Sequence, residues 1–166
     1  MVHCQLAVMN KRVLLAIDME TPALWAASYA VQLAARLGLS LAVMAVFPVK
    51  PGSLANGEIS PEVLEEDTRL WLGKIRERCQ QEGVSMEIFI SSGPFYEEVL
   101  RFANSQSSVQ FIIMGLAGDF PQGGTECSPL LASLNQQFEG EVLLVRVQGK
   151  VARLADICRQ NSTREN

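Results

Sequence analysis

Residues 12–47 read RVLLAIDMETPALWAASYAVQLAARLGLSLAVMAVF, and this stretch carries the pattern on which the fold interpretation rests. Its two apolar runs, Arg12–Asp18 and Leu39–Phe47, are short and nearly continuous, which is typical of strands buried on both faces of a parallel sheet. Between them, apolar residues recur at helical spacing from Ala23 onward. Thr21–Pro22 supplies an N-cap and a proline at the first helical position. The stretch therefore predicts a strand, a crossover helix and a second parallel strand.

The same alternation continues to the end of the chain. Further strands are expected at 85–91, 109–115 and 141–147, and further helices from Ser60–Pro61 to Gly83, at 95–105 and from Ser128–Pro129. Five strands and four helices predict a single-domain α/β fold, a doubly wound parallel sheet with helices on both faces. We expect an N-terminal extension at 1–10, the folded domain at 11–148 and a C-terminal tail at 149–166. The tail is expected to carry a short amphipathic turn with Val151, Leu154 and Ile157 on one side.

Length, composition and charge narrow the class of protein. The 166 residues fit one domain, and 48% hydrophobic with 19% charged residues is the balance of a folded globular chain. A net charge of −4 without a dense lysine or arginine stripe disfavours nucleic-acid binding, which depends on neutralising phosphates. No apolar run approaches the roughly 20 residues that span a bilayer, and residues 1–10 lack the features of a signal peptide. A cytoplasmic protein without membrane insertion is expected.

Side chains suited to metal or acid–base chemistry are sparse. The one histidine, His3, lies in the N-terminal extension, and the four cysteines are scattered without metal-ligand spacing: Cys4, Cys79, Cys127 and Cys158. The sequence has no P-loop, and no GxGxxG motif follows the first strand. Glu97 and Glu98 open a helix, where acids favour the dipole, and are expected to be solvated rather than catalytic. We therefore expect no metal site and no catalytic residues, with slow ATP hydrolysis as the upper limit of any activity.

Two strand ends carry residues that could contact a ligand. In a doubly wound sheet, ligands bind beyond the carboxyl ends of the strands, where the strand order reverses. Asp18 ends the first strand, and Met114–Gly115 end the fourth. Gly115 and Gly118 allow close backbone approach, and the helix after Ser128 points its positive end toward the same crevice, so a phosphate cradle is plausible. A plain structural turn fits the glycines as well, and an Asp in this position often caps local N–H groups.

The sequence resembles the universal stress proteins from about Lys11 to Val147. The likeness is carried by RVLLAID at the first strand, SSGPFYEEVLRFA before the fourth, FIIMGLAG at its end, and SPLLASL and EVLLVRV at the close. The resemblance implies a Rossmann-like sheet of order 3-2-1-4-5 and a homodimer formed through the last strand, 141–147. It also implies a role in stress resistance and membership of either a nucleotide-binding or a non-binding group.

The nucleotide-binding members of that family share the motif G-x2-G-x9-G-[ST], with an Asp near the adenosine at the end of the first strand. By position, Asp18 matches that acid, and Val46 and Met114 fall where family residues flank the adenine. Gly115 and Gly118 match the first two glycines. The candidate nucleotide-binding residues are therefore Asp18, Val46, Met114, Gly115, Gly118 and Ser128.

The last pair of the motif departs from the family pattern. Ser128–Pro129 stands where Gly-Ser or Gly-Thr is expected, and Pro129 offers a phosphate neither an N–H nor a hydroxyl. The pair is a good helix start instead. The preceding loop has no Lys, Arg or His and carries Asp119 and Glu126, which would repel a triphosphate.

Three functional hypotheses follow. The favoured one is a cytoplasmic, dimeric stress-response module with a degraded motif, no required cofactor, and weak or no nucleotide binding. The second is an ATP- or AMP-binding protein with the adenosine between the first and fourth strands. The third is a regulatory domain that docks on a partner protein such as a transporter, through the 48–60 loop and the tail from Gly149.

Overall fold

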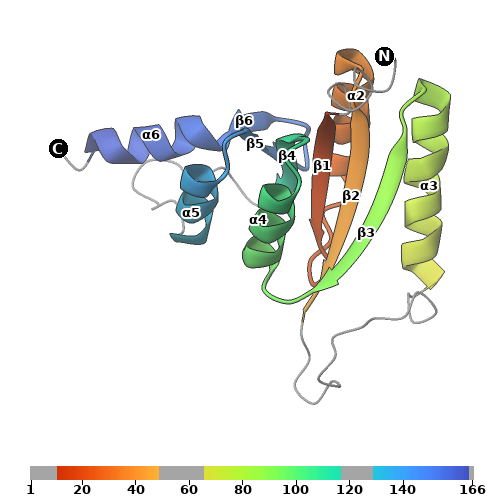
Figure 1. Cartoon of the computed structure of the whole chain (residues 1–166), viewed down its shortest axis with the longest axis horizontal. Helices are drawn as coiled ribbons and strands as arrows, with labels where there is room; N and C mark the ends of the chain where they lie inside the picture. Colours follow the sequence, from red (N-terminus) through yellow and green to blue (C-terminus); the bar gives the residue numbers. More distant parts are fainter. Residues whose placement is uncertain (1–10, 49–65, 117–128, 165–166) are drawn as a thin grey trace.

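The computed structural model describes residues 11–48, 66–116 and 129–164. Its centre is a six-stranded sheet of order β3-β2-β1-β4-β5-β6 (Figure 1). The strands are β1 (Arg12–Asp18), β2 (Ser40–Phe47), β3 (Met86–Ser92), β4 (Val109–Leu116), β5 (Glu141–Arg146) and β6 (Val151–Arg153). The helices are α2 (Ala26–Leu37), α3 (Glu66–Glu82), α4 (Phe95–Ser105), α5 (Pro129–Gln137) and α6 (Leu154–Arg164). The first five strands run parallel, which confirms the predicted doubly wound α/β fold and its order 3-2-1-4-5.

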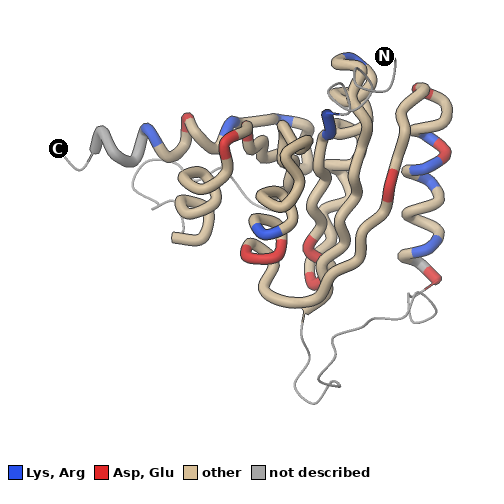
Figure 2. Tube along the Cα trace, in the orientation of Figure 1, with Lys and Arg blue, Asp and Glu red and all other residues tan. Residues whose placement is uncertain are grey.

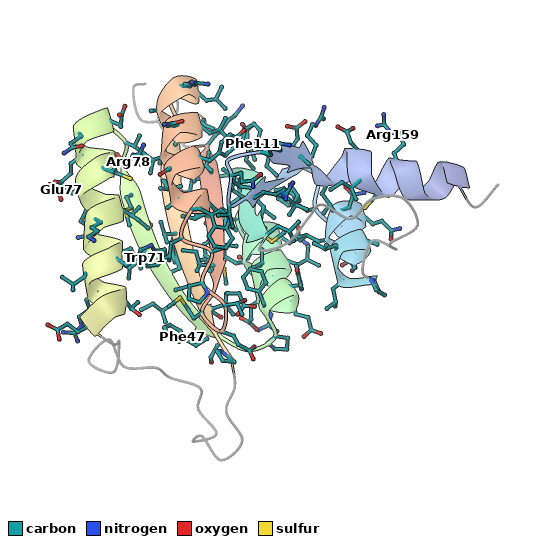
Figure 3. All side chains as sticks on the ribbon, turned by 180° about the vertical axis from the view of Figure 1, so that it is seen from behind. Phe47, Trp71, Glu77, Arg78, Phe111 and Arg159 are labelled. Atoms are coloured by element: carbon teal, nitrogen blue, oxygen red, sulfur yellow. The ribbon has the colours of Figure 1, made fainter. Side chains whose placement is uncertain are left out.

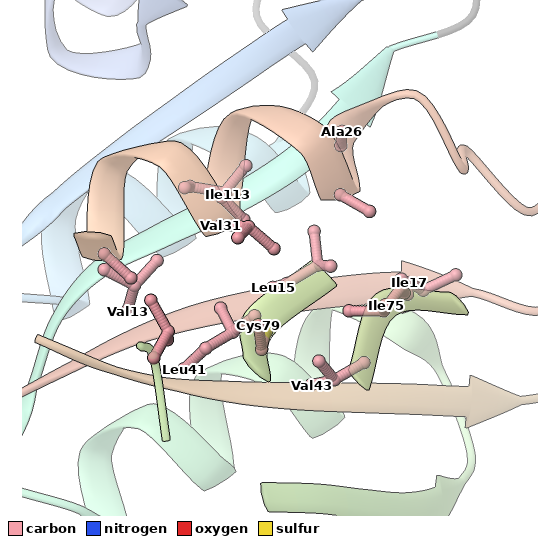
Figure 4. Close-up of a cluster of buried hydrophobic side chains, with 14 of the residues drawn as sticks. Val13, Leu15, Ile17, Ala26, Val31, Leu41, Val43, Ile75, Cys79 and Ile113 are labelled. Carbon is pink, nitrogen blue, oxygen red and sulfur yellow. The ribbon is translucent and has the colours of Figure 1, made fainter. Parts of the chain in front are cut away.

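Helices cover both faces of the sheet, and β1 lies at its centre. Val13, Leu15 and Ile17 pack beneath α2 and α3 in the cluster of Figure 4, whereas Leu14 and Ala16 pack toward α4, α5 and α6. All five side chains are 0–3% exposed. A strand buried on both faces needs apolar residues at every inner position, which explains why RVLLAID is continuous rather than alternating.

Helix α3 packs on the cluster that contains Val13, Leu15 and Ile17. Its buried residues are Thr68, Leu72, Ile75 and Cys79. Arg78 donates from Nη1 to the hydroxyl of Ser28 over 2.6 Å, and this bond links α3 to α2 (Figure 3). The expected helix start at Ser60–Pro61 lies outside the described residues, as does most of the 48–60 loop.

The start of α2 differs from the prediction. The helix begins at Ala26, with Trp25 as an N-cap residue that makes no side-chain capping bond, and Thr21–Pro22 lies in the preceding loop. The indole N–H of Trp25 donates to the carbonyl of Val145 on β5 over 2.9 Å. This tertiary contact holds the loop against the sheet, so the local capping signal at Thr21–Pro22 was wrong. The end of the helix follows the sequence, because Gly38 adopts the left-handed conformation at φ 67°.

The C-terminal region is more ordered than the predicted amphipathic turn. After a turn at Gly149, with φ 87°, the chain forms β6, which pairs antiparallel with β5, and then α6. Leu154 and Ile157 are 0% and 6% exposed. The strand expected to form the homodimer, 141–147, is therefore paired on its outer side with β6 of the same chain.

Among the described residues, no helix combines the length and the apolar character that crossing a membrane requires.

Candidate functional site

The described candidate residues come together at the carboxyl ends of β2, β1 and β4. Asp18 lies opposite Val46 in the β1–β2 register, and Met114 lies opposite Ala16 in the β1–β4 register. Gly115 follows Met114 on the same strand. The strand order reverses between β1 and β4, which is where open α/β sheets place a ligand crevice. Gly118 and Ser128 lie outside the described residues.

The side chains of Val46 and Met114 belong to the hydrophobic core. They are 1% and 3% exposed and pack in the cluster on the α4 and α5 side of the sheet. The carbonyl of Val46 accepts the N–H of Met19 over 2.9 Å, which closes the end of β2 against the loop after β1. Neither side chain is therefore free to surround a base.

Asp18 organises the loop that leaves β1. Its Oδ1 accepts the N–H of Glu20 over 3.0 Å, and its main-chain carbonyl accepts the N–H of Thr21 over 3.1 Å. The first contact is the local capping role that short acidic side chains often take between elements. One carboxylate oxygen is thus engaged by the chain itself.

Asp18 also lines a cavity of about 330 Å³ at this end of the sheet. The other lining residues are Glu20, Pro48, Gly93, Pro94 and Phe95. They follow β1, β2 and β3, so the cavity lies toward the β3 side of β1 rather than over Gly115. No described Lys or Arg lines it, and Figure 2 shows acidic positions at the carboxyl end of β1 and the start of α4. Two carboxylates without a cation suit hydroxyl or N–H donors and disfavour phosphate.

Gly115 is surrounded by the loop that precedes α2. A Cβ built on Gly115 would overlap the Cβ of Ala23, lie 3.2 Å from Nε1 of Trp25, and lie 3.3 Å from the carbonyl oxygen of Ala23. The same Trp25 nitrogen donates to Val145, directly opposite Gly115 in the β4–β5 register. The absence of a side chain at Gly115 therefore admits the protein's own loop. Sequence reasoning missed Ala23 and Trp25, although a tryptophan in a short loop before a helix is a signal of such a contact.

The corner between β3 and α4 is held by Glu98. Ser91 donates its hydroxyl proton to Oε2 of Glu98 over 2.6 Å, and Arg101 lies 3.1 Å from Oε1. The Glu98 side chain is 12% exposed, so the expectation that it is solvated was wrong, while Glu97 is exposed as predicted. Gly93, at φ 140°, passes close to Glu98 at the same corner. Glu98 thus fixes the start of α4, where the cavity is lined by Pro94 and Phe95.

Acidic and sulfur ligands do not gather elsewhere in the described part of the chain. Across residues 11–48, 66–116 and 129–164, no group of three or more His, Cys, Asp or Glu side chains is arranged to hold a metal ion.

Burial raises the pKa of the Cys79 thiol, and nearby Arg78 opposes part of that rise.

Comparisons with known proteins show what this arrangement is similar to. The model of the universal stress protein family matches residues 9–157. A comparison with curated proteins finds no match.

Solved structures share the fold across nearly their whole length. A protein from the universal stress protein family of Burkholderia pseudomallei has a TM-score of 0.55 and 20% identity, with 82% of this chain and 96% of that chain covered. A universal stress protein in complex with cAMP has a TM-score of 0.55 and 15% identity, with 84% and 98% covered. One from Archaeoglobus fulgidus in complex with dAMP has a TM-score of 0.53 and 14% identity, with 82% and 98% covered. At these identities the likeness is one of fold.

Proposed function

The chain belongs to the universal stress protein family, and from this premise we propose that it is a cytoplasmic stress-response module without enzymatic activity that binds adenine nucleotides weakly or not at all. The observation that carries the proposal is the filled space at Gly115. A ligand that approached this backbone from the α2 side would displace Ala23 and break the bond from Trp25 to Val145. A hydrogen bond of this kind contributes about 0.5–1.5 kcal/mol net. Those costs would be subtracted from any nucleotide affinity.

The phosphate end of the motif supports the same proposal. Helix α5 begins at Pro129, a residue with no N–H to donate and no hydroxyl. The sequence between Gly118 and Ser128 adds two acids and no cation. A nucleotide would therefore meet a site with fewer donors and more negative charge than its phosphates require.

A second candidate function is adenine-nucleotide binding through the nucleoside half. The acidic cavity lined by Asp18 favours it, because the carboxylates suit ribose hydroxyls and the Phe95 ring suits a base. Structural relatives in complex with cAMP and dAMP are consistent with this candidate. On this alternative, AMP and adenosine would bind with similar affinity, because the phosphates contribute little.

The test is the nucleotide content and affinity of the purified protein. Heat extraction followed by chromatography reports bound nucleotide, and calorimetric titration with magnesium ATP, AMP and adenosine reports affinity. We expect no bound nucleotide and dissociation constants weaker than about 100 µM. Bound ATP or a micromolar dissociation constant would overturn the proposal, and tight adenosine binding would favour the second candidate.

Substitutions at the last pair of the motif test which of the missing donors limits ATP binding. Ser128→Gly combined with Pro129→Ser restores an N–H, a hydroxyl and close approach, and is expected to increase ATP affinity. Ser128→Gly combined with Pro129→Ala restores the N–H and close approach without the hydroxyl and is the matched control. If neither pair changes ATP affinity while the folded state is retained, the space at Gly115 is the dominant obstacle. Absence of any nucleotide in all forms would direct attention to a protein partner.

A further inference from the structure

The strand β5 would be the outer strand of the sheet if the chain ended before Gly149. Its four inner residues, Val142–Val145, are 1–6% exposed in the complete structure. An outer strand presents a row of unpaired N–H and C=O groups, and such an edge is a template for pairing with another chain. The apolar sequence of β5 makes this edge a strong template.

Residues Val151–Arg164, here called the C-terminal arm, occupy that edge. Leu143, Leu144 and Val145 pair with Arg153, Ala152 and Val151 in an antiparallel ladder. The N–H of Arg146 donates to the carbonyl of Lys150 over 2.9 Å. Because hydrogen-bonded and non-hydrogen-bonded pairs alternate in such a ladder, Leu144 and Ala152 form the next hydrogen-bonded pair.

The arm packs against both faces of the sheet. Val151 packs with the cluster under α2 and α3, while Leu154 and Ile157 are buried in the cluster on the α4 and α5 side. An ion pair between Arg153 and Glu141 adds a contact across the edge. The arm is thus anchored by side chains on two opposite faces as well as by its backbone.

The arm replaces a good pairing edge with a poor one. β6 is only 3 residues long, follows Lys150, and ends at Arg153. Short strands and positive charges are devices by which proteins protect sheet edges. A second chain would find few backbone groups to pair with and two cations beside them.

We propose that the C-terminal arm occupies the position that a second copy of this chain would otherwise take at β5, and so keeps the intact protein from self-associating through this edge. The partner excluded is a second copy because the four inner residues of β5 are apolar and its backbone is self-complementary in an antiparallel pair. The inference concerns assembly and does not depend on nucleotide binding.

The intact chain gives the first test. Sedimentation equilibrium over a wide concentration range should return the mass of one chain, 18.2 kDa. Amide hydrogen exchange by NMR should show Leu144 protected at every concentration, because its N–H group faces the arm. An intact dimer in which cross-links join Glu141 or Arg146 of two copies would overturn the proposal.

The variant Ala152→Pro removes the N–H that pairs with Leu144 and keeps the apolar anchors. We expect exchange at Leu144 to accelerate about tenfold or more at low concentration. At high concentration we expect dimers and renewed protection of Leu144. Ala152→Ser keeps the N–H and is the matched control, expected to remain monomeric. The amide of Val145 faces β4 and serves as an internal control that stays protected throughout.

A second variant, Leu154→Asp, removes an anchor of the arm instead of a backbone bond. The oligomeric state is then measured for whichever of the two variants shows fast hydrogen exchange of the Leu144 amide. Self-association of that variant supports the proposal, and a monomer with a fast-exchanging Leu144 at high concentration would overturn it. Continued protection of Leu144 in monomers of both variants would also overturn it, because the arm would not be what covers the edge.

Discussion

Replacing Gly115 with alanine is expected to destabilise the protein although it adds only one methyl group. The new Cβ would overlap the Cβ of Ala23 and lie close to Trp25. Ala23 lies in the loop that runs from β1 to α2, so this loop must move to relieve the overlap. Movement of the loop strains or breaks the bond from Trp25 to Val145.

The magnitude follows from those two costs. Adding a methyl group to a well-packed site costs typically 1–3 kcal/mol, and losing one hydrogen bond adds about 1 kcal/mol. We therefore expect Gly115→Ala to lower the free energy of unfolding by about 2–4 kcal/mol. Gly73→Ala is the matched control, since Gly73 is in the interior of α3 with nothing within 4 Å of an added Cβ. There the same substitution should raise the free energy of unfolding by about 0.5–1 kcal/mol.

Urea unfolding followed by circular dichroism measures both changes. A double-mutant cycle with Ala23→Gly isolates the contact, because that substitution removes the atom that Gly115→Ala would strike. The pair of substitutions should recover part of the lost stability, corresponding to a favourable coupling of about 1 kcal/mol or more. Gly115→Ala within about 0.5 kcal/mol of the parent protein, or strictly additive effects in the cycle, would refute the packing argument.

Three further changes test other contacts. Trp25→Phe removes the indole donor, so the free energy of unfolding should fall by about 0.5–1.5 kcal/mol in urea titrations, whereas no change would contradict the contribution assigned to this bond. Glu98→Ala should lower the melting temperature more than Glu97→Ala does, because only Glu98 accepts from Ser91; equal effects would contradict this assignment. Burial raises the pKa of the Cys79 thiol, so its contribution to stability is fully present below the ordinary thiol pKa near 8.5 and is lost as pH rises through the folded value. Stability should therefore fall above about pH 8.5, and less steeply in Cys79→Ala, whereas identical slopes would contradict it.

Much of the fold can be predicted from the sequence because its strongest signals are local. β1 and β2 are buried on both faces, so each appears as an uninterrupted apolar run. Helix α2 ends where Gly38 predicts, because the left-handed conformation is a property of that residue and its neighbours. The order of the strands came from family resemblance rather than from periodicity.

The differences lie where distant residues meet. The start of α2 depends on a bond from Trp25 to Val145, and no local pattern encodes a partner 120 positions away. β6 is too short for a two-residue period to be recognised, and its stability comes from the neighbouring β5.

The candidate site was predicted as a set of strand ends, and the described part of that set does converge. What the sequence did not reveal is how the space is used. Asp18 binds the N–H of Glu20, one of the two roles considered for it, and Gly115 accommodates Ala23. The contact at Gly115 depends on which atoms of the loop and the sheet face each other, and this information is absent from spacing alone. The bond of Asp18 is local, and an Asp between two elements often makes it.

The central place of β1 has a consequence for the way the protein is made. Arg12 pairs with Ser40, which the ribosome adds soon afterwards, but its other neighbour, Val109, follows roughly 100 residues after it. At about 5–20 residues per second, the newly synthesised chain carries β1 with one backbone edge unpaired for about 5–20 s. During that interval the strand that later forms the most protected part of the molecule is a ready substrate for chaperones and for mispairing with other nascent chains.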